Sequence, residues 1–439
     1  MKQVKLSIEE SNLFEKLCSL EYLTKGFRAV KRNRGSPGID GVAIEEFEDC
    51  LNQELMQLKK ELESWMYDPN PVRRVEIPKP GKNTGVRLLG IPCVRDRVVQ
   101  ATLKLILEPI LDPTFSDNSY GFRAGRNQRM AVESAKHIVN KGKEYVVDID
   151  LSKFFDRVHH DRLMSRLSRY ISDKRILRLI GVTLRSGVMV SEDTVTPSYE
   201  GTVQGSPLSP LMSNVVLDEL DKELESRGLE FCRFADDCNI FVRSLKAARR
   251  VMKTVTRFVE QRLKLVINQR KSKVALSQDV VFLGMTIVHG TIAIAARSLN
   301  RAMQKVKKLT PRGTFQPLEE TIESINRWYI GWSGYFSMTE YPKQLEKIEA
   351  HVRRRLRSRF VDQQKRRRYL FKKLVKRGVP RRWAAKTVFS NKGRWALSHT
   401  PAVERAYSNR WFIREMGLKI RSDENQVHWF GVSKWVKVS

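Results

Sequence analysis

The sequence predicts an α+β protein with more than one domain, in which strands and helices are mixed first and a helical, basic part follows. Runs of β-branched and aromatic residues at 145–150 and 231–242 lie between segments with apolar residues at helical spacing. Beyond residue 297 the apolar spacing is wholly helical. The chain has 439 residues, 41% of them apolar, which is too long for one compact core and predicts two to four domains.

The charge balance points to a polyanionic partner. Lysine and arginine total 81 against 49 acidic residues, a net charge of +32, which favours nucleic acid over a small-molecule substrate. A membrane surface would attract the same charge, but apolar stretches such as 103–111 are too short to span a bilayer, so we expect no membrane partner. The first residues contain no apolar signal segment, and we expect a cytosolic protein. Five cysteines without Cys-x-x-Cys spacing indicate neither a disulfide framework nor a zinc module.

The mixed region can be followed element by element. Helices fill the first seventy residues and are interrupted by one glycine-rich loop at 34–41. Strand-like runs at 73–78 and 87–91 flank the turn Pro80-Gly-Lys-Asn83 and predict a basic hairpin. The expected elements after it are, in order, a helix over 95–111, a strand at 145–150, a helix over 160–169, a hairpin at 231–242, an amphipathic helix near 247–263 and a strand at 280–283.

A tight loop, Gln204-Gly-Ser-Pro-Leu-Ser-Pro210, leads into a further helix before the second hairpin. Ser209 is the expected N-cap of this helix, because a serine hydroxyl can accept a hydrogen bond from a free backbone N–H of the first turn. Pro210 suits the first turn, and Gly228 is expected to end the helix.

The C-terminal part combines helical spacing with strong positive charge. Leu299, Met303 and Val306 share one helix face, with basic residues on the other. Residues 351–385 carry fifteen lysines or arginines and only one acid. Aromatic residues lie among these cations, a combination that suits phosphate contacts and base stacking, although a solvated charge run is the alternative. The aromatic residues are Phe360, Tyr369, Phe371 and Trp383.

The hairpin at 231–242 is the most informative segment, because Asp236 and Asp237 stand side by side between its strands. Adjacent carboxylates repel unless a cation binds, and a pair of divalent metals held by carboxylates is the usual device for phosphoryl and nucleotidyl transfer. An ordinary polar turn is the alternative. A metal site needs a further acid, for which Asp148, Asp150 and Asp156 are candidates, and spacing alone does not choose among them.

An ordered series of short motifs resembles the group II intron reverse transcriptases. The motifs occur in that family's order across roughly residues 25–336. They are Arg73-Arg-Val-Glu-Ile-Pro-Lys-Pro80, Arg87-Leu-Leu-Gly-Ile-Pro92, Ser119-Tyr-Gly-Phe-Arg123, Asp150-Leu-Ser-Lys-Phe-Phe-Asp156, Gln204-Gly-Ser-Pro-Leu-Ser-Pro210, Phe234-Ala-Asp-Asp237, Asn268-Gln-Arg-Lys-Ser272 and Phe282-Leu-Gly284.

The resemblance implies which acids are catalytic. In the family the catalytic acid precedes paired aromatic residues by four and five positions, which here selects Asp150. Asp150, Asp236 and Asp237 are then the catalytic acids and hold Mg²⁺, or alternatively Mn²⁺, and Leu151 is a further metal-binding position. Asp156 is expected to cap the next helix instead.

The resemblance also implies a nucleotide site. Phe155 lies where a ribose 2′-hydroxyl would be and excludes ribonucleotides, with a core aromatic as the alternative. The basic hairpin closes over the triphosphate, Gln204 positions the incoming nucleotide, and Lys271 protonates pyrophosphate. The expected nucleotide-binding residues are Lys79, Arg87, Phe154, Phe155, Gln204 and Lys271.

For the fold, the resemblance implies a right-hand polymerase. Fingers and palm with an antiparallel sheet are expected over 1–295, a helical thumb or maturase domain over 296–370, and a basic DNA-binding region over 371–439. The tail is most similar to compact bacterial class C members without an HNH endonuclease, which places the protein in a bacterial cytosol or nucleoid. Residues 325–336 resemble the maturase segment that grips intron RNA, although core packing also explains their aromatic residues.

The function implied is RNA-directed DNA synthesis by two metal ions, together with binding of structured group II intron RNA to assist splicing and mobility. The expected partners are an RNA template, intron RNA, a DNA primer or target, and deoxynucleoside triphosphates. Two alternatives remain: an RNA-binding maturase without polymerase activity, and a free-standing reverse transcriptase in repair or phage defence. Three positions depart from the family, with Phe234 for tyrosine and Val203 and Ala124 for prolines. The lost tyrosine hydroxyl concerns fidelity or primer handling more than activity.

Overall fold

The computed structural model describes residues 12–78, 85–191, 194–196, 200–311 and 313–421. The chain divides into two compact units, residues 1–276 and 277–439. The expected boundary at 295 differs from this division. The strand at 291–294 is tied to the second unit, since the backbone N–H of Ile294 donates to Gln344 Oε1 at 2.8 Å.

Helices form the N-terminal part of the first unit, as predicted. The side chain of Ser19 accepts a hydrogen bond from Tyr22 N and caps α2. Helices α2 and α5 pack so closely that a Cβ on Gly26 would lie 2.1 Å from Thr102 Oγ1. The bounds are α1 (Leu13–Cys18), α2 (Leu20–Asn33), α3 (Ile44–Asp49), α4 (Leu51–Glu63), α5 (Val94–Leu111) and the 3₁₀ turn η2 (Asp112–Thr114).

A four-stranded sheet in the order β2-β1-β4-β5 contains the expected basic hairpin. Strands β1 (Val72–Pro78) and β2 (Val86–Ile91) pair antiparallel, with Glu76 opposite Leu88. Strand β4 (Val188–Ser191) pairs parallel with β1 and antiparallel with β5 (Thr194–Thr196). The predicted turn at 80–83 lies outside the described residues.

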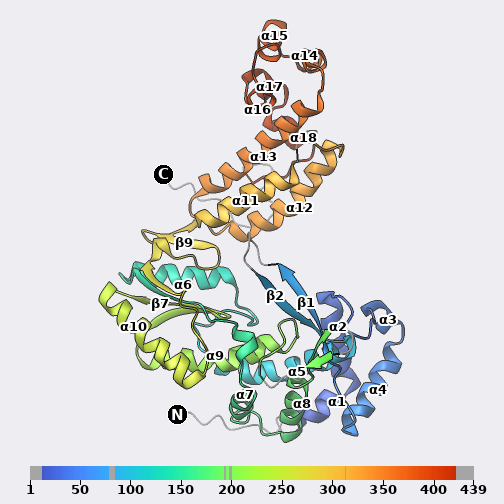
Figure 1. Ribbon diagram of the computed structural model, residues 1–439, viewed down its shortest axis with the longest axis vertical. Helices are drawn as coiled ribbons and strands as arrows, with labels where there is room; N and C mark the ends of the chain where they lie inside the picture. The colour runs from blue at the N-terminus through green and yellow to red at the C-terminus, as the bar shows by residue number, and fades with distance from the viewer. Residues whose placement is uncertain (1–11, 79–84, 192–193, 197–199, 312, 422–439) are drawn as a thin grey trace. The chain divides into compact units, whose positions relative to one another are not determined.

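A second four-stranded sheet, in the order β6-β7-β3-β8, is antiparallel throughout. It brings the two β-rich runs together, because β3 (Tyr145–Ile149) lies between β7 (Asp237–Val242) and β8 (Lys273–Leu276). Strand β6 (Glu230–Phe234) forms the other arm of the predicted hairpin. Helices α6 (Gln128–Asn140), α9 (Ser209–Ser226) and α10 (Leu245–Phe258) lie against the sheet, as Figure 1 shows.

Three local predictions were wrong, two in the first unit and one at the start of the second. Ser209 is the first helical residue of α9 and not its N-cap, because its hydroxyl donates to Val203 O at 2.7 Å. Asp156 lies in the 3₁₀ turn η3 (Phe154–Arg157) and does not cap α7 (His160–Leu167), whose N-cap position is His159. No strand covers 280–283. The chain instead forms β8, the turn η5 (Ser277–Asp279) and then β9 (Met285–Val288).

Two further elements complete the first unit. Helix α8 (Lys174–Leu184) begins after Asp173, whose carboxylate caps it by accepting a hydrogen bond from Arg175 N. The expected amphipathic helix is α10, which continues into the π-turn η4 (Val259–Leu263).

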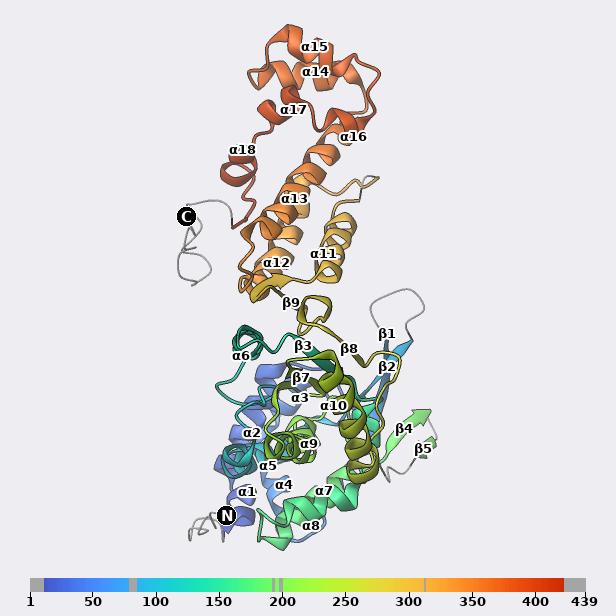
Figure 2. The same ribbon diagram turned by 90° about the vertical axis from the view of Figure 1, so that its left-hand side faces the viewer.

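In its described residues the second unit is helical apart from one hairpin, β9 and β10 (Thr291–Ile294), which confirms the helical spacing predicted beyond residue 297. Helices α11, α12 and α13 lie against one another, as Figure 2 shows. The helices are α11 (Ala296–Leu309), α12 (Leu318–Phe336), α13 (Pro342–Gln363), α14 (Arg367–Lys376), α15 (Arg381–Val388), α16 (Arg394–Leu397), α17 (Pro401–Ala406) and α18 (Asn409–Arg414).

A single buried cluster runs through this unit from Ala302 to Ile420, so the expected boundary at 370 does not divide its core. Buried arginines of α13 donate to oxygens from elsewhere in this unit, as for Arg357, whose Nε donates to Tyr407 O at 2.9 Å. No helix among the described residues is both long and apolar enough to cross a bilayer.

Candidate active site

The β-ladder register places the predicted acids side by side. Ile149 of β3 pairs with Cys238 of β7, so the next residue on each strand, Asp150 and Asp237, are neighbours at the same end of the sheet. Phe234 pairs with Asp237 across the hairpin, which leaves Ala235 and Asp236 as a two-residue loop. Two acids distant in sequence thus meet at one end of the two central strands.

Burial and neighbouring charges raise the pKa values of two of these carboxyl groups, Asp236 and Asp237. Burial first, and then the charges of Asp148, Asp236 and Asp150, raise the pKa of Asp237 to about 7. The pKa of Asp236 is also raised, first by burial and then by the charge of Asp150. The charges of Asp150 and Asp236 thus act on Asp237, and the charge of Asp150 acts on Asp236.

Two of the predicted cations act on this cluster. Lys271 Nζ lies 3.1 Å from Asp150 Oδ2 and 3.3 Å from Oδ1. The charges of Arg87 and Lys271 both lower the pKa of Asp236, against the larger effect of burial. Arg87 is exposed on β2. Lys79 lies outside the described residues.

As the side chains stand, no three His, Cys, Asp or Glu residues of the described segments form a group that could hold a metal ion. The ammonium of Lys271 instead pairs with Asp150. The chemistry of the donors still suits a divalent cation, because clustered carboxylates with raised pKa values are neutralised best by one. The residues fit the metal in kind, and a bound metal would compete with Lys271 for the carboxylate of Asp150.

The paired aromatic residues have different environments. Phe154 is 2% exposed and belongs to the hydrophobic core, so its side chain is closed to a nucleotide and the expected contact is not supported. Phe155 is partly exposed, and its ring makes an edge contact with that of Phe154 at 5.2 Å between centroids. Thr202 N donates to Phe155 O at 2.6 Å, which fixes the backbone of Phe155 to the segment that precedes Gln204.

Gln204 is tied to the basic hairpin through its backbone. Gly90 N donates to Gln204 O at 2.9 Å. A Cβ on Gly205, which has a φ of +123°, would lie 2.6 Å from Gly90 O, so this close approach requires glycine. The loop and β2 are therefore held together next to the carboxylates that Arg87 influences.

Sequence reasoning missed two features of the site. Asp148, set aside in favour of Asp150, has a pKa raised to about 6 by burial and is the charge that acts most strongly on Asp237. The buried Arg233, three residues before Asp236, was not singled out. An arginine between the apolar residues Cys232 and Phe234 of a strand was the available signal.

The aromatic residues of the second unit are divided between core and surface. In the segment 325–336, Tyr329 is fully buried, whereas Trp328 and Trp332 are partly exposed and stack at 5.6 Å. In the basic region, Tyr369 and Trp383 are about half exposed, at 54% and 51%.

Known protein families match both units. The model of the reverse transcriptase (RNA-dependent DNA polymerase) family matches residues 77–287, which contain all three acids, and that of the group II intron maturase-specific domain matches 299–378. Protein YkfC of Escherichia coli (strain K12) is 33% identical over 323 residues, covering 64% of this chain and 84% of YkfC. The chain belongs to the group II intron reverse transcriptases. Its fold is that of a right-hand polymerase followed by a helical region.

Other relatives of this reverse transcriptase are longer. The group II intron-encoded protein LtrA of Lactococcus lactis subsp. cremoris is 29% identical over 250 residues, which cover 57% of this chain and 40% of LtrA. The chain thus spans less than half the length of LtrA. Telomerase from Candida tropicalis, solved with a telomeric RNA fragment, has a TM-score of 0.44 at 12% identity over 88% of this chain and 68% of that one. That likeness is too weak to argue from.

Proposed function

We propose that this reverse transcriptase extends a DNA primer on an RNA template and that it also binds structured group II intron RNA to assist splicing and mobility. The observation that carries the proposal is the meeting of Asp150 and Asp237 at the end of two paired strands, with Asp236 beside them in the loop. Neither an RNA-binding surface nor a structural hairpin requires three carboxylates in one place.

Asp150, Asp236 and Asp237, with the carbonyl oxygen of Leu151, are the groups that would hold the divalent metal, which we propose is Mg²⁺ or Mn²⁺. When bound, such ions stabilise the attacking and leaving oxygens of nucleotidyl transfer. The raised pKa values of Asp236 and Asp237 support this assignment, because a bound cation would offset the burial and the mutual repulsion of these carboxylates.

The neighbouring cations have complementary tasks. Arg87, exposed on β2, adds positive charge near Asp236, where it can bind the triphosphate and neutralise departing pyrophosphate. Lys271, whose Nζ lies 3.1 Å from Asp150 Oδ2, is the proposed proton donor to pyrophosphate. Lys79 is assigned to the triphosphate from the sequence alone.

Phe155 and Gln204 are proposed to select the nucleotide. The ring of Phe155 is supported by the buried Phe154, and its backbone is held by Thr202, so it cannot easily move aside for a ribose 2′-hydroxyl. Gln204 is held next to β2 by its own carbonyl, which leaves its side chain to contact the incoming nucleotide.

The second unit is proposed to bind nucleic acid, with intron RNA at the maturase-specific domain and DNA at the basic region after it. Exposed rings next to cations provide stacking and phosphate contacts together. Tyr369 and Trp383 are such rings, and Arg354 lies 4.7 Å from the centroid of the Trp395 ring.

Primer extension on an RNA template with Mg²⁺ tests the proposal. The wild-type protein is expected to extend the primer, and Asp150→Asn to extend none of it while it binds the same RNA with unchanged affinity. Asp49→Asn, at an exposed acid of α3, is the matched control and should remain active. A wild-type protein that promotes intron splicing but extends no primer would instead be an RNA-binding maturase. Extension without any effect on splicing would indicate a free-standing reverse transcriptase.

A further inference from the structure

Arg233 is a fully buried arginine at the base of the catalytic hairpin. It lies on β6, three residues before Asp236, and its relative exposure is 0%. Each of its N–H groups has an acceptor within the palm. The contacts are Nε to Asp221 Oδ1 at 2.7 Å, Nη1 to Asn214 Oδ1 and to Ala235 O at 3.0 Å each, and Nη2 to Ser119 Oγ at 2.7 Å and to Asp221 Oδ2 at 2.6 Å.

One of these contacts reaches the loop that carries the acids. Ala235 immediately precedes Asp236 and has a φ of +58°, a conformation that alanine rarely adopts. Such a conformation persists only where the surrounding structure holds it. The hydrogen bond from the buried Arg233 Nη1 to Ala235 O stabilises this backbone conformation.

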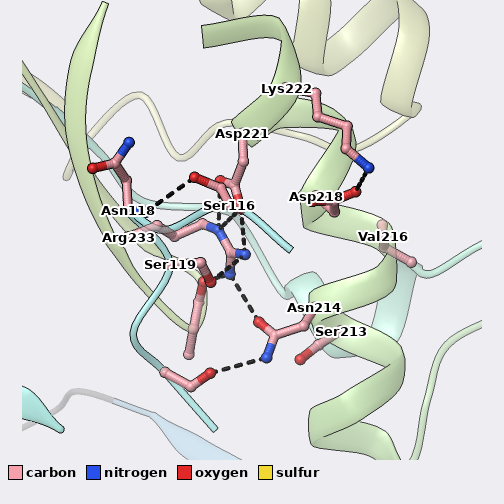
Figure 3. A network of polar contacts seen from close by, with 12 residues as sticks. Ser116, Asn118, Ser119, Ser213, Asn214, Val216, Asp218, Asp221, Lys222 and Arg233 are labelled. Carbon is pink, nitrogen blue, oxygen red and sulfur yellow. Dashed lines mark hydrogen bonds and ion pairs between the residues drawn. The ribbon is translucent and has the colours of Figure 1, made fainter. Parts of the chain in front are cut away.

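Residues 118–121 form a second element that contacts the same loop. Arg233 N donates to Asn118 O, and Tyr120 N donates to Arg233 O, each at 2.9 Å, so this segment lies beside β6 like an added strand. A Cβ on Gly121 would lie 2.2 Å from Ala235 N. Asn214 on α9 joins the two, since its Nδ2 donates to Gly121 O at 2.9 Å while its Oδ1 accepts from Arg233 (Figure 3).

The ion pair at the centre is not needed for stability alone. Arg233 and Asp221 are both fully buried, and a buried pair of this kind often contributes no more to folding than apolar side chains of the same volume. The planar guanidinium, in contrast, fixes four partners in one geometry, which an apolar side chain or a lysine could not do.

We propose that Arg233 is a positioning residue for nucleotidyl transfer. It sets the backbone of Ala235, and through it the direction in which Asp236 and Asp237 present their carboxylates to Asp150. Arg233 contacts neither nucleotide nor metal and acts only through the loop. This inference rests on the proposed polymerase function.

The test is Arg233→Lys, which keeps the buried charge and removes the planar guanidinium that holds the four partners. The turnover number kcat per folded molecule is expected to fall by about 10- to 100-fold, because small displacements of catalytic groups are costly. The KM for deoxynucleotide and the affinity for RNA should change little. The Mg²⁺ concentration for half-maximal rate should rise, since the loop would present two metal-binding acids less well.

The matched control is Arg166→Lys. Arg166 also packs against α9, where its Nη1 donates to Val215 O at 3.0 Å and its guanidinium pairs with Glu219, but it has no contact with the loop. Its kcat and Mg²⁺ dependence are expected to match the wild type. A residue with only a structural role would reduce the folded fraction and leave both quantities per folded molecule unchanged.

Gly121→Ala disturbs the same loop without altering Arg233, because the new methyl group would meet Ala235 N. It should reproduce the loss of kcat and the raised Mg²⁺ requirement, and it decides the question if Arg233→Lys does not fold. Folded variants that behave like the Arg166→Lys control would overturn the inference and leave the polymerase function intact. Absence of extension by the wild type would overturn the polymerase function first, and the inference with it.

Discussion

Replacing Asp237 by asparagine is expected to abolish DNA synthesis and yet to stabilise the metal-free protein at pH 8. The reason lies in the environment of the carboxylate. Burial and the charges of Asp148, Asp236 and Asp150 raise the pKa of Asp237 to about 7 from an ordinary value of 3.8. Asparagine has nearly the same shape and carries no charge, so the variant avoids the cost of burying a charge as well as the repulsion.

The size and sign of this stabilisation follow from proton linkage. Between pH 3.8 and about 7 the folded protein keeps a proton on Asp237 that the unfolded chain has lost, so the free energy of unfolding falls as the pH rises through this range. At about 1.4 kcal/mol for each pKa unit, the charged group costs at most about 4 kcal/mol at pH 8 and less than half of that at pH 5. The gain in Asp237→Asn should therefore be largest at pH 8 and shrink toward pH 5.

Pulsed hydrogen exchange across a urea titration in EDTA measures this gain, read from peptides that contain β3 and β7. Asp49→Asn, at an exposed acid of α3, is the control for loss of a surface charge and should leave the free energy of unfolding close to that of the wild type. Added Mg²⁺ should stabilise the wild type more than Asp237→Asn. An equal gain at pH 5 and pH 8, or no gain at pH 8, would refute the reasoning.

Two further predictions concern the nucleotide site and the second unit. Phe155→Ala should raise the relative incorporation of ribonucleotides by about tenfold or more, because the ring that blocks the 2′-hydroxyl is removed, and an unchanged ratio of kcat/KM in single-nucleotide extension would contradict this role. Tyr329→Phe removes the hydrogen bond from the buried Tyr329 hydroxyl to Glu349 Oε1 at 2.5 Å and should lower the free energy of unfolding of the second unit by about 1–3 kcal/mol. Tryptophan fluorescence during urea unfolding measures it, since Trp65 is the only tryptophan of the first unit, and an unchanged midpoint would count against the prediction.

Local patterns predicted most of the elements correctly. Both hairpins were recognisable because β-branched and aromatic residues lie next to turn residues, and the long helices because their apolar faces repeat at helical spacing. The errors occurred where tertiary contacts prevailed. Serine is a residue type favoured at N-caps, but the hydroxyl of Ser209 donates a hydrogen bond to Val203 O instead. The apolar run at 280–283 resembles a strand, but the neighbouring strands β8 and β9 belong to different compact units.

The sequence by itself determined the family and the basic character, and it predicted which three acids form the site, because motifs and composition depend on residue type and order. Only the tertiary structure decided what surrounds those acids. Asp150 and Asp237 are 87 positions apart and meet because β3 pairs with β7. Arg233 reaches Ser119, 114 positions earlier, and fixes the loop through partners that no local pattern reveals. The raised pKa of Asp237 and the backbone conformation of Ala235 arise from burial and neighbouring groups, which exist only once the chain has folded.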